Sequence, residues 1–228
     1  KFDSAIIYHQ KAIDLVPGWP AAHVNKIQSL ILRNGKTAEA RSLLDEAVKK
    51  TGDPVMETRI LLSIYERDYN TALLEVTKSF PSDFNFGVSR LMYLARISYL
   101  TSRSEDAKAF SDSALAELGN NLKINPNSPE LHGFTGMAYA YMGDREKAVE
   151  EGEKSIILAT KNKMLESDMK VNLAIIYLIV NEPDKASSLL AYLLNSPSFL
   201  SREQLQLDPI WKQLLDKPEY RHVILKRL

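Results

Sequence analysis

Histidine side chains are the first candidates for acid–base chemistry or metal binding in this sequence. The four histidines are His9, His23, His132 and His222, and they lie far apart along the chain. None belongs to an HExxH sequence, and none has an aspartate four residues away on the same helical face. The sequence therefore predicts packing or surface positions for these residues rather than a metal site.

Nucleophilic and phosphate-binding patterns are also missing. The absence of cysteine excludes disulfides, thiolate nucleophiles and cysteine–zinc sites. No serine stands in a nucleophile elbow, and no glycine-rich loop could hold a phosphate. The acidic cluster Glu150, Glu151 and Glu153 is typical of a solvated helix face. We expect no catalytic residue, no metal and no cofactor, and hence no enzyme.

The overall composition narrows the range of partners. The chain has 29 basic residues (Lys plus Arg) and 29 acidic residues (Asp plus Glu), so its formal net charge is zero. This net charge does not favour binding to nucleic acid. No apolar run reaches the ~20 residues that cross a bilayer. A chain without cysteine is compatible with the periplasm as well as the cytoplasm, which we favour. Because it begins at Lys1 without a signal peptide, we expect it to be a fragment of a longer protein.

An internal repeat organises the chain. Six short polar segments each end in an alanine, and the intervals between these alanines are 35, 32, 35, 41 and 38 residues; the alanines are Ala5, Ala40, Ala72, Ala107, Ala148 and Ala186. Repeats of about 34 residues are typical of stacked helix–turn–helix units. Seven residues after each alanine, on the same helical face, five of six positions hold alanine or serine. These positions predict close packing of the second helix of each unit against the first.

The segment Ser128 to Ile157 has the clearest pattern. It contains the following residues in order: Gly136, Tyr139, Gly143, Asp144 and Ala148. In this order they resemble the tetratricopeptide repeat (TPR) family, although His132, Gly152 and Thr160 replace a usual tryptophan, aromatic and proline. The resemblance covers nearly the whole chain and implies an all-α fold, an α-α superhelix of about five helix pairs.

The resemblance also gives a domain organisation. Residues 1–198 form the repeats, in units of about 1–17, 20–53, 54–82, 84–125, 128–162 and 163–198, of which the first is a half-repeat lacking its first helix. Gly143 is expected to end a helix and Asp144 to cap the next one, and Leu118 to Asn121 also has the pattern of a helix end.

Residues 199–228 are expected to form a C-terminal cap. In this tail Ser201 is a predicted N-cap, and Pro209 and Pro218 separate short helices. The tail looks like that of TPR regions in bacterial signalling proteins.

The family's inner-face positions supply candidate partner-binding residues in a concave groove. They are Asn25, Arg33, Tyr65, Met92, Arg96, Tyr99, Met137 and Tyr141. Met, Tyr and Arg are enriched at protein interfaces, but Met and Tyr at helical spacing are equally compatible with a core. We expect a non-catalytic scaffold that binds a protein or peptide of unknown identity, as the sensor or adaptor part of a larger bacterial signalling protein. The alternatives are a self-association module that forms a homo-oligomer, or an envelope-associated TPR protein.

Overall fold

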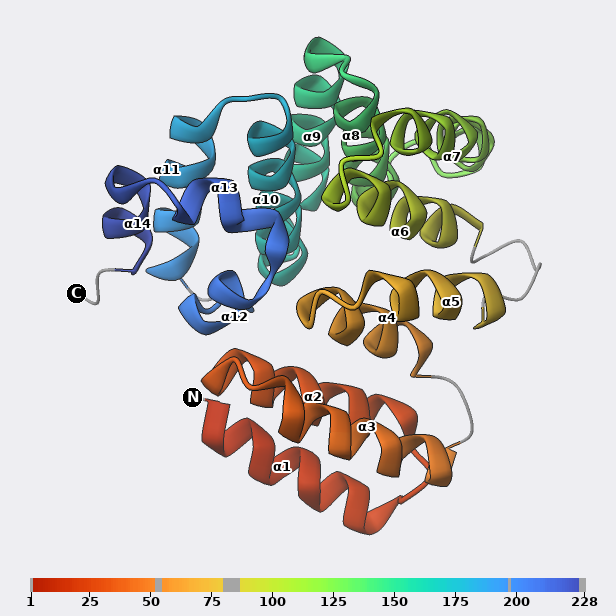
Figure 1. The fold of residues 1–228 in the computed structure, drawn as a ribbon, viewed down its shortest axis with the longest axis vertical. Helices are drawn as coiled ribbons and strands as arrows, with labels where there is room; N and C mark the ends of the chain where they lie inside the picture. Colours follow the sequence, from red (N-terminus) through yellow and green to blue (C-terminus); the bar gives the residue numbers. More distant parts are fainter. Residues whose placement is uncertain (1, 52–54, 80–86, 197, 226–228) are drawn as a thin grey trace. The chain divides into compact units, whose positions relative to one another are not determined.

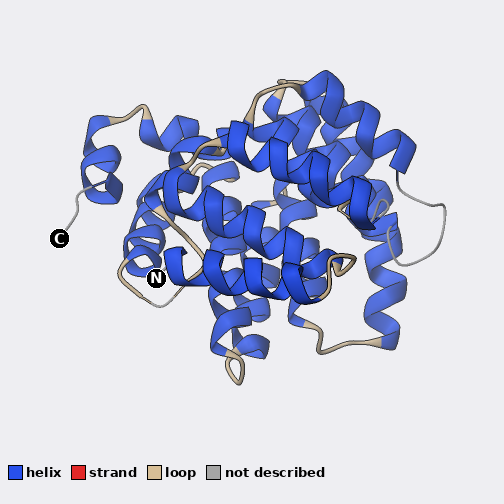
Figure 2. Ribbon diagram, turned by 90° about the horizontal axis from the view of Figure 1, so that it is seen from below, coloured by secondary structure: helices blue, strands red, loops and turns tan. Residues whose placement is uncertain are grey.

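The computed structural model describes residues 2–51, 55–79, 87–196 and 198–225. Within these ranges the regular elements are helices (Figures 1 and 2). They are α1 (Phe2–Leu15), α2 (Pro20–Asn34), α3 (Thr37–Thr51), α4 (Met56–Tyr65), α5 (Tyr69–Ser79), α6 (Gly87–Leu100), α7 (Ser104–Ile124), α8 (Pro129–Met142), α9 (Arg145–Ala159), α10 (Lys163–Ile179), α11 (Pro183–Leu194), α12 (Arg202–Leu207), the 3-10 turn η1 (Pro209–Trp211), α13 (Lys212–Leu215) and α14 (Pro218–Leu225).

Helices α2 to α11 form five consecutive pairs, each a first helix packed on a second helix: α2 with α3, α4 with α5, α6 with α7, α8 with α9 and α10 with α11. Helix α1 precedes them and packs on α2. This is a tetratricopeptide-like helical repeat fold, as the sequence predicted.

The chain is divided into two compact units. Unit 1 contains Lys1–Ser79 and Leu200–Pro209, and unit 2 contains Phe80–Phe199 and Ile210–Leu228. The C-terminal tail is therefore shared: its first part, with α12, belongs to unit 1, and its second part, with α13 and α14, belongs to unit 2.

One backbone feature recurs in every pair. The residue with positive φ between the two helices stands five positions before the repeat alanine; these residues are Gly35, Arg67, Ser102, Gly143 and Asn181. A left-handed residue satisfies the last carbonyl groups of a helix and reverses the chain. The identical spacing in all five pairs confirms the repeat register.

The repeat alanines make the close helix contacts that the sequence predicted. Those of α3, α5, α7, α9 and α11 are all buried, with at most 2% of their surface exposed. The contact of α8 with α9 is especially close. A Cβ placed on Gly136 would come within 2.9 Å of the carbonyl oxygen of Ala148 and within 2.9 Å of the amide nitrogen of Gly152.

Most predicted helix boundaries agree with the structure, with one exception. Asp144 and Ser201 cap α9 and α12, and helical segments begin at Pro209 and Pro218. The expected helix end at Leu118 to Asn121 is wrong, because α7 continues to Ile124. Gly119 lies within α7 with open space where a Cβ would stand, so no packing requirement ends the helix there.

Candidate protein-interaction surface

The three candidate residues of unit 1 occupy different environments. Asn25 is exposed on α2. Arg33, in the last turn of α2, forms ion pairs with Asp3 on α1 at 3.3 Å and with Glu39 on α3 at 3.5 Å. Tyr65, the last residue of α4, is buried. The structure thus places Arg33 in contacts that join α2 to its two neighbouring helices.

The candidate residues of unit 2 are brought closer together. Met92 and Tyr141 are buried in one hydrophobic cluster, and Tyr99 and Met137 pack against it. The ring centroids of Tyr99 and Tyr141 are 5.4 Å apart, and the rings are inclined at 52°. Arg96, on α6, is half-buried. Four of the five side chains are therefore part of the core between first helices.

In unit 1 the start of the tail packs on the first helices. Helix α12 contacts α2, with Leu205 fully buried. Leu207 packs against a cluster of side chains from α2, α3, α4 and the residue before α4, which are Ile27, Ile31, Ala40, Leu44, Ala47, Val55, Leu62 and Tyr65. The amide of Gln204 donates to the hydroxyl of Tyr65 at 3.4 Å.

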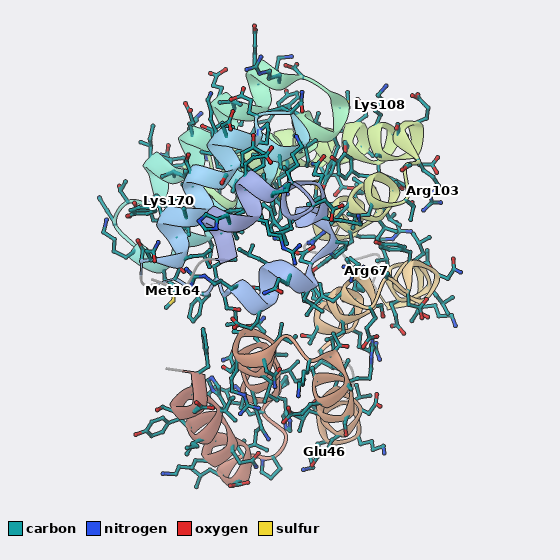
Figure 3. The ribbon with its side chains drawn as sticks, turned by 60° about the vertical axis from the view of Figure 1, so that its left-hand side comes forward. Glu46, Arg67, Arg103, Lys108, Met164 and Lys170 are labelled. Atoms are coloured by element: carbon teal, nitrogen blue, oxygen red, sulfur yellow. The ribbon has the colours of Figure 1, made fainter. Side chains whose placement is uncertain are left out.

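Two backbone contacts fix this part of the tail at the carboxyl ends of α2 and α4. Arg67, labelled in Figure 3, donates to the carbonyl oxygen of Leu207 at 3.2 Å and to that of Tyr65 at 2.6 Å. At the turn after α2, a Cβ on Gly35 would lie 3.1 Å from the carbonyl oxygen of Glu203. Glycine at this position therefore allows α12 to approach the turn closely.

In unit 2 the rest of the tail packs in a comparable way. Ile210, Trp211 and Leu214 are buried. The side-chain amide of Gln213 donates to the carbonyl oxygen of Leu178, close to the end of α10, at 3.3 Å. Burial raises the pKa of Tyr99, and a hydrogen bond with Gln213 offsets only part of this rise. In both units, tail residues thus contact first helices near their carboxyl ends.

The sequence pattern identified the tail but not its positions. Its short helices, its N-cap and its apolar residues follow from local rules, whereas the surface on which each part packs is a long-range property. The sequence signal that could have indicated this packing is the pair of leucines, Leu205 and Leu207, in the six-residue helix α12. Packing on the last repeat alone does not account for both leucines.

Two histidines occupy equivalent positions at the start of first helices. Nε2 of His23 lies 2.8 Å from the carbonyl oxygen of Pro17, and Nε2 of His132 lies 2.9 Å from that of Pro126. Nδ1 of His132 also lies 2.5 Å from a carboxylate oxygen of Glu151 on α9. Each histidine ring thus contacts the backbone of the loop that precedes its helix, which agrees with the packing role predicted for these histidines.

A shallow pocket of about 490 Å³ lies between α10 and α11, lined by Leu173, Tyr177, Asp184, Lys185, Ser188, Leu189 and Tyr192. Lys170 (labelled in Figure 3) lies 4.8 Å from the centroid of the Tyr192 ring. The hydroxyl of Tyr177 donates to Glu153 at 3.2 Å, and burial together with this carboxylate raises the pKa of Tyr177 to about 12. An apolar floor with a charged rim suits an apolar side chain better than a reacting group.

Two further properties concern the part of the chain that the structure describes. No group of three His, Asp or Glu side chains there is arranged to hold a metal ion. No helix in the described ranges has the length and apolar character needed to cross a bilayer.

Comparison with known proteins finds similarity among solved structures. The chain is similar to the crystal structure of a thermophilic TPR protein from Thermus thermophilus, with 19% sequence identity and a TM-score of 0.39; the alignment covers 99% of this chain and 91% of that one. No protein-family model matches the sequence, and no curated protein matches it. The helix pairs and their turn register define the fold.

Proposed function

We propose that this chain is a non-catalytic protein-interaction module that binds a peptide or short helix along its first helices. The candidate residues are those that the repeat pattern predicts, namely Asn25, Arg33, Tyr65, Met92, Arg96, Tyr99, Met137 and Tyr141. Tyr65, Met92 and Tyr141 are buried and would support the surface from within, whereas the other five are at least partly exposed and can contact a partner. The partner is a protein segment rather than nucleic acid, because the net charge is zero.

One observation carries the proposal: in unit 1, this surface holds a short helix, α12, from a distant part of the same chain. Helix α12 places Leu205 and Leu207 against α2 and its neighbours, while Gln204 reaches Tyr65. Apolar anchors combined with a few directed polar contacts are the usual way in which a groove recognises a helix. The chemistry of a partner segment follows from α12: two leucines two residues apart, one of them fully buried, with polar residues around them.

A second feature supports the same mode of binding. Arg67 binds the carbonyl oxygen of Leu207, a contact that recognises backbone rather than a particular side chain. Such a contact is available to any segment that follows the path of residues 200–209. We infer that an external partner binds unit 1 by replacing this part of the tail.

The experiment measures the affinity of a fluorescent peptide that copies residues 199–210. The wild-type chain should bind this peptide weakly, because the tail occupies the surface and lowers the fraction of molecules that are free to bind. Leu205→Ala in the chain, a substitution that costs about 2–5 kcal/mol in packing, should loosen the tail and tighten peptide binding at least about tenfold. Helical circular dichroism should remain close to that of the wild type.

Matched controls separate release of the tail from general loosening. Leu74→Ala removes the same atoms from an exposed leucine of α5 in the same unit, and should leave peptide affinity unchanged. A peptide with both leucines replaced by glutamate should not bind. Equal binding of the two peptides, or equal affinity of wild-type and Leu205→Ala chains, would contradict the proposal.

The adaptor role in a larger bacterial signalling protein is a narrower part of this proposal and rests on the tail's resemblance alone. Its test is the full-length sequence: a cyclase, kinase or DNA-binding domain next to the repeats would support it. An envelope lipoprotein signal would favour the alternative.

A further inference from the structure

Asn34 is the only asparagine in the sequence that is followed by glycine. Asparagine side chains react most readily in this setting, because glycine has no Cβ to hinder attack of its amide nitrogen on the preceding carboxamide. The pair lies where α2 ends: Asn34 is the last residue of the helix, and Gly35 follows it at φ 64°. The reactive dipeptide therefore coincides with the turn that α12 approaches closely.

The carboxamide of Asn34 is held over the backbone that it would react with. The amide nitrogen of Lys36 donates to its Oδ1 at 2.9 Å, which turns the side chain back toward Gly35. Its Nδ2 donates to Oε2 of Glu39 at 3.5 Å, and both contacts are exposed to solvent. The donor at Oδ1 polarises the carbonyl and stabilises negative charge on this oxygen during attack on Cγ. The side-chain geometry thus favours ring closure.

One backbone hydrogen bond opposes the reaction in the folded chain. The amide nitrogen of Gly35 donates to the carbonyl oxygen of Ile31 at 2.9 Å, so the attacking nitrogen is engaged in the last turn of α2. Attack requires that this bond break and that the nitrogen lose its proton. Local opening of the last turn therefore limits the rate.

The tail packs on both ends of this hydrogen bond. Helix α12 contacts α2 (Figure 1), and Leu207 packs against the cluster that contains Ile31. At the other end, the carbonyl oxygen of Glu203 lies 3.1 Å from the position of a Cβ on Gly35. Release of α12 removes this packing, so the last turn of α2 opens more often when the tail is undocked.

We propose that Asn34 is a site of spontaneous deamidation and that the docking of α12 sets its rate. The amide nitrogen of Gly35 loses its proton to solvent base and bonds to Cγ of Asn34. The bond from Cγ to Nδ2 breaks, and Nδ2 leaves as ammonia with a proton from water. Water then opens the resulting succinimide at either carbonyl, which yields aspartate or isoaspartate. The net change is one water taken up and one ammonia released, without oxidation or reduction.

Both products weaken the docking of α12. Aspartate replaces the donor Nδ2 with a second carboxylate beside Glu39. Isoaspartate also adds a methylene to the main chain before Gly35, which displaces the turn from Ile31 and Glu203. A chain that deamidates while its tail is released is therefore kept in the released state. This inference rests on the packing of α12 and does not require the partner proposed above, so failure of the peptide-binding experiment would leave it intact.

The experiment follows conversion of Asn34 in the full chain at mildly alkaline pH, by mass spectrometry of peptides with chromatographic separation of isoaspartate. Native chain should convert at least about tenfold more slowly than chain unfolded in guanidinium. Leu205→Ala should raise the native rate at least about fivefold, because lost packing favours the open turn. Gln204→Ala removes the hydrogen bond to Tyr65 but keeps both leucines, and should raise the rate less.

Controls separate tail release from general loosening. Leu74→Ala, at an exposed position of α5, should leave the rate at Asn34 unchanged. Asn127 is exposed between α7 and α8 in unit 2, and it should convert equally in all native samples. Asn34→Gln prevents the reaction, because glutamine closes its larger ring much more slowly. Amide exchange in residues 202–207 should become faster as wild-type chain converts, and should stay constant in Asn34→Gln.

Two results on the rate would overturn the proposal: equal conversion of Asn34 in Leu205→Ala and Leu74→Ala, or equal conversion in native and unfolded wild-type chain. A third concerns the consequence. If wild-type molecules with a converted Asn34 keep the exchange protection that residues 202–207 have in Asn34→Gln, deamidation does not release the tail.

Discussion

The close contact of α8 with α9 allows the same substitution to be tested in two environments. Gly136 and Gly119 are both inside helices of unit 2. A Cβ on Gly136 would lie 2.9 Å from the carbonyl oxygen of Ala148, from the amide nitrogen of Gly152 and from Cδ1 of Ile176, whereas ordinary Cβ contacts lie at 3.4–4 Å. Two of these three atoms are backbone, so α8 and α9 must move apart. A Cβ on Gly119 would meet nothing within 4 Å.

The expected magnitudes follow from two opposing effects. In both helices, alanine improves helix propensity by about 0.5–1 kcal/mol relative to glycine. At position 136, overpacking costs about 1–3 kcal/mol, and contact with backbone atoms points to the upper half of this range. Gly136→Ala should therefore destabilise the protein by about 1–2.5 kcal/mol, and Gly119→Ala should stabilise it by about 0.5–1 kcal/mol.

Urea unfolding followed by tryptophan fluorescence measures both effects. Trp211 is buried in unit 2, with both glycines, whereas Trp19 is half exposed and should respond weakly to unfolding. The melting temperature should shift by about 2–4 °C for each kcal/mol in a chain of this size. The reasoning is refuted if Gly136→Ala is as stable as the wild type while Gly119→Ala gains stability as expected.

Two further predictions concern the turns and an ionic cluster. Ser102→Gly should stabilise the chain by about 0.5–1 kcal/mol, because serine is strained at its positive φ. Gly143→Ala, at φ 87°, should destabilise the chain by about 1 kcal/mol. Thermal melts in which both variants shift in the same direction would contradict this reasoning. Hydrogen bonds from Lys163 and Lys170 lower the pKa of Glu166 from 4.5 to about 2. The stability that Glu166 contributes should be complete above pH 4.5 and lost as pH falls toward 2, so Glu166→Gln should flatten urea-unfolding stability across this range.

The repeat register could be predicted from sequence because its signals are local. Alanines at two-turn spacing, Gly35 and Gly143 in the turns, and Ser201 before a helix each follow from the geometry of a few neighbouring residues. Arg67 and Ser102 show the limit of such local signals. They adopt the same left-handed conformation as the two glycines, but their residue types do not favour it, whereas asparagine, at Asn181, is a residue type that does.

The candidate surface could be predicted only in part. Projecting inner-face positions selected Met92, Tyr99, Met137 and Tyr141 for a groove, and the structure places them in or against one hydrophobic cluster. The projection assumed that no other segment packs on the first helices. The packing of α12, with its buried Leu205, against α2 joins segments that are far apart in the sequence, and no local pattern encodes such a contact.

The shared tail has a consequence for synthesis. Residues 1–79 leave the ribosome long before residues 200–209, which complete unit 1. At about 5–20 residues per second, the intervening ~120 residues take roughly 6 to 24 s. During this interval the apolar surface that later receives Leu205 and Leu207 is open to chaperones or to neighbouring chains. A nonsense mutation between residues 80 and 200 would therefore leave unit 1 incomplete, although it removes none of residues 1–79.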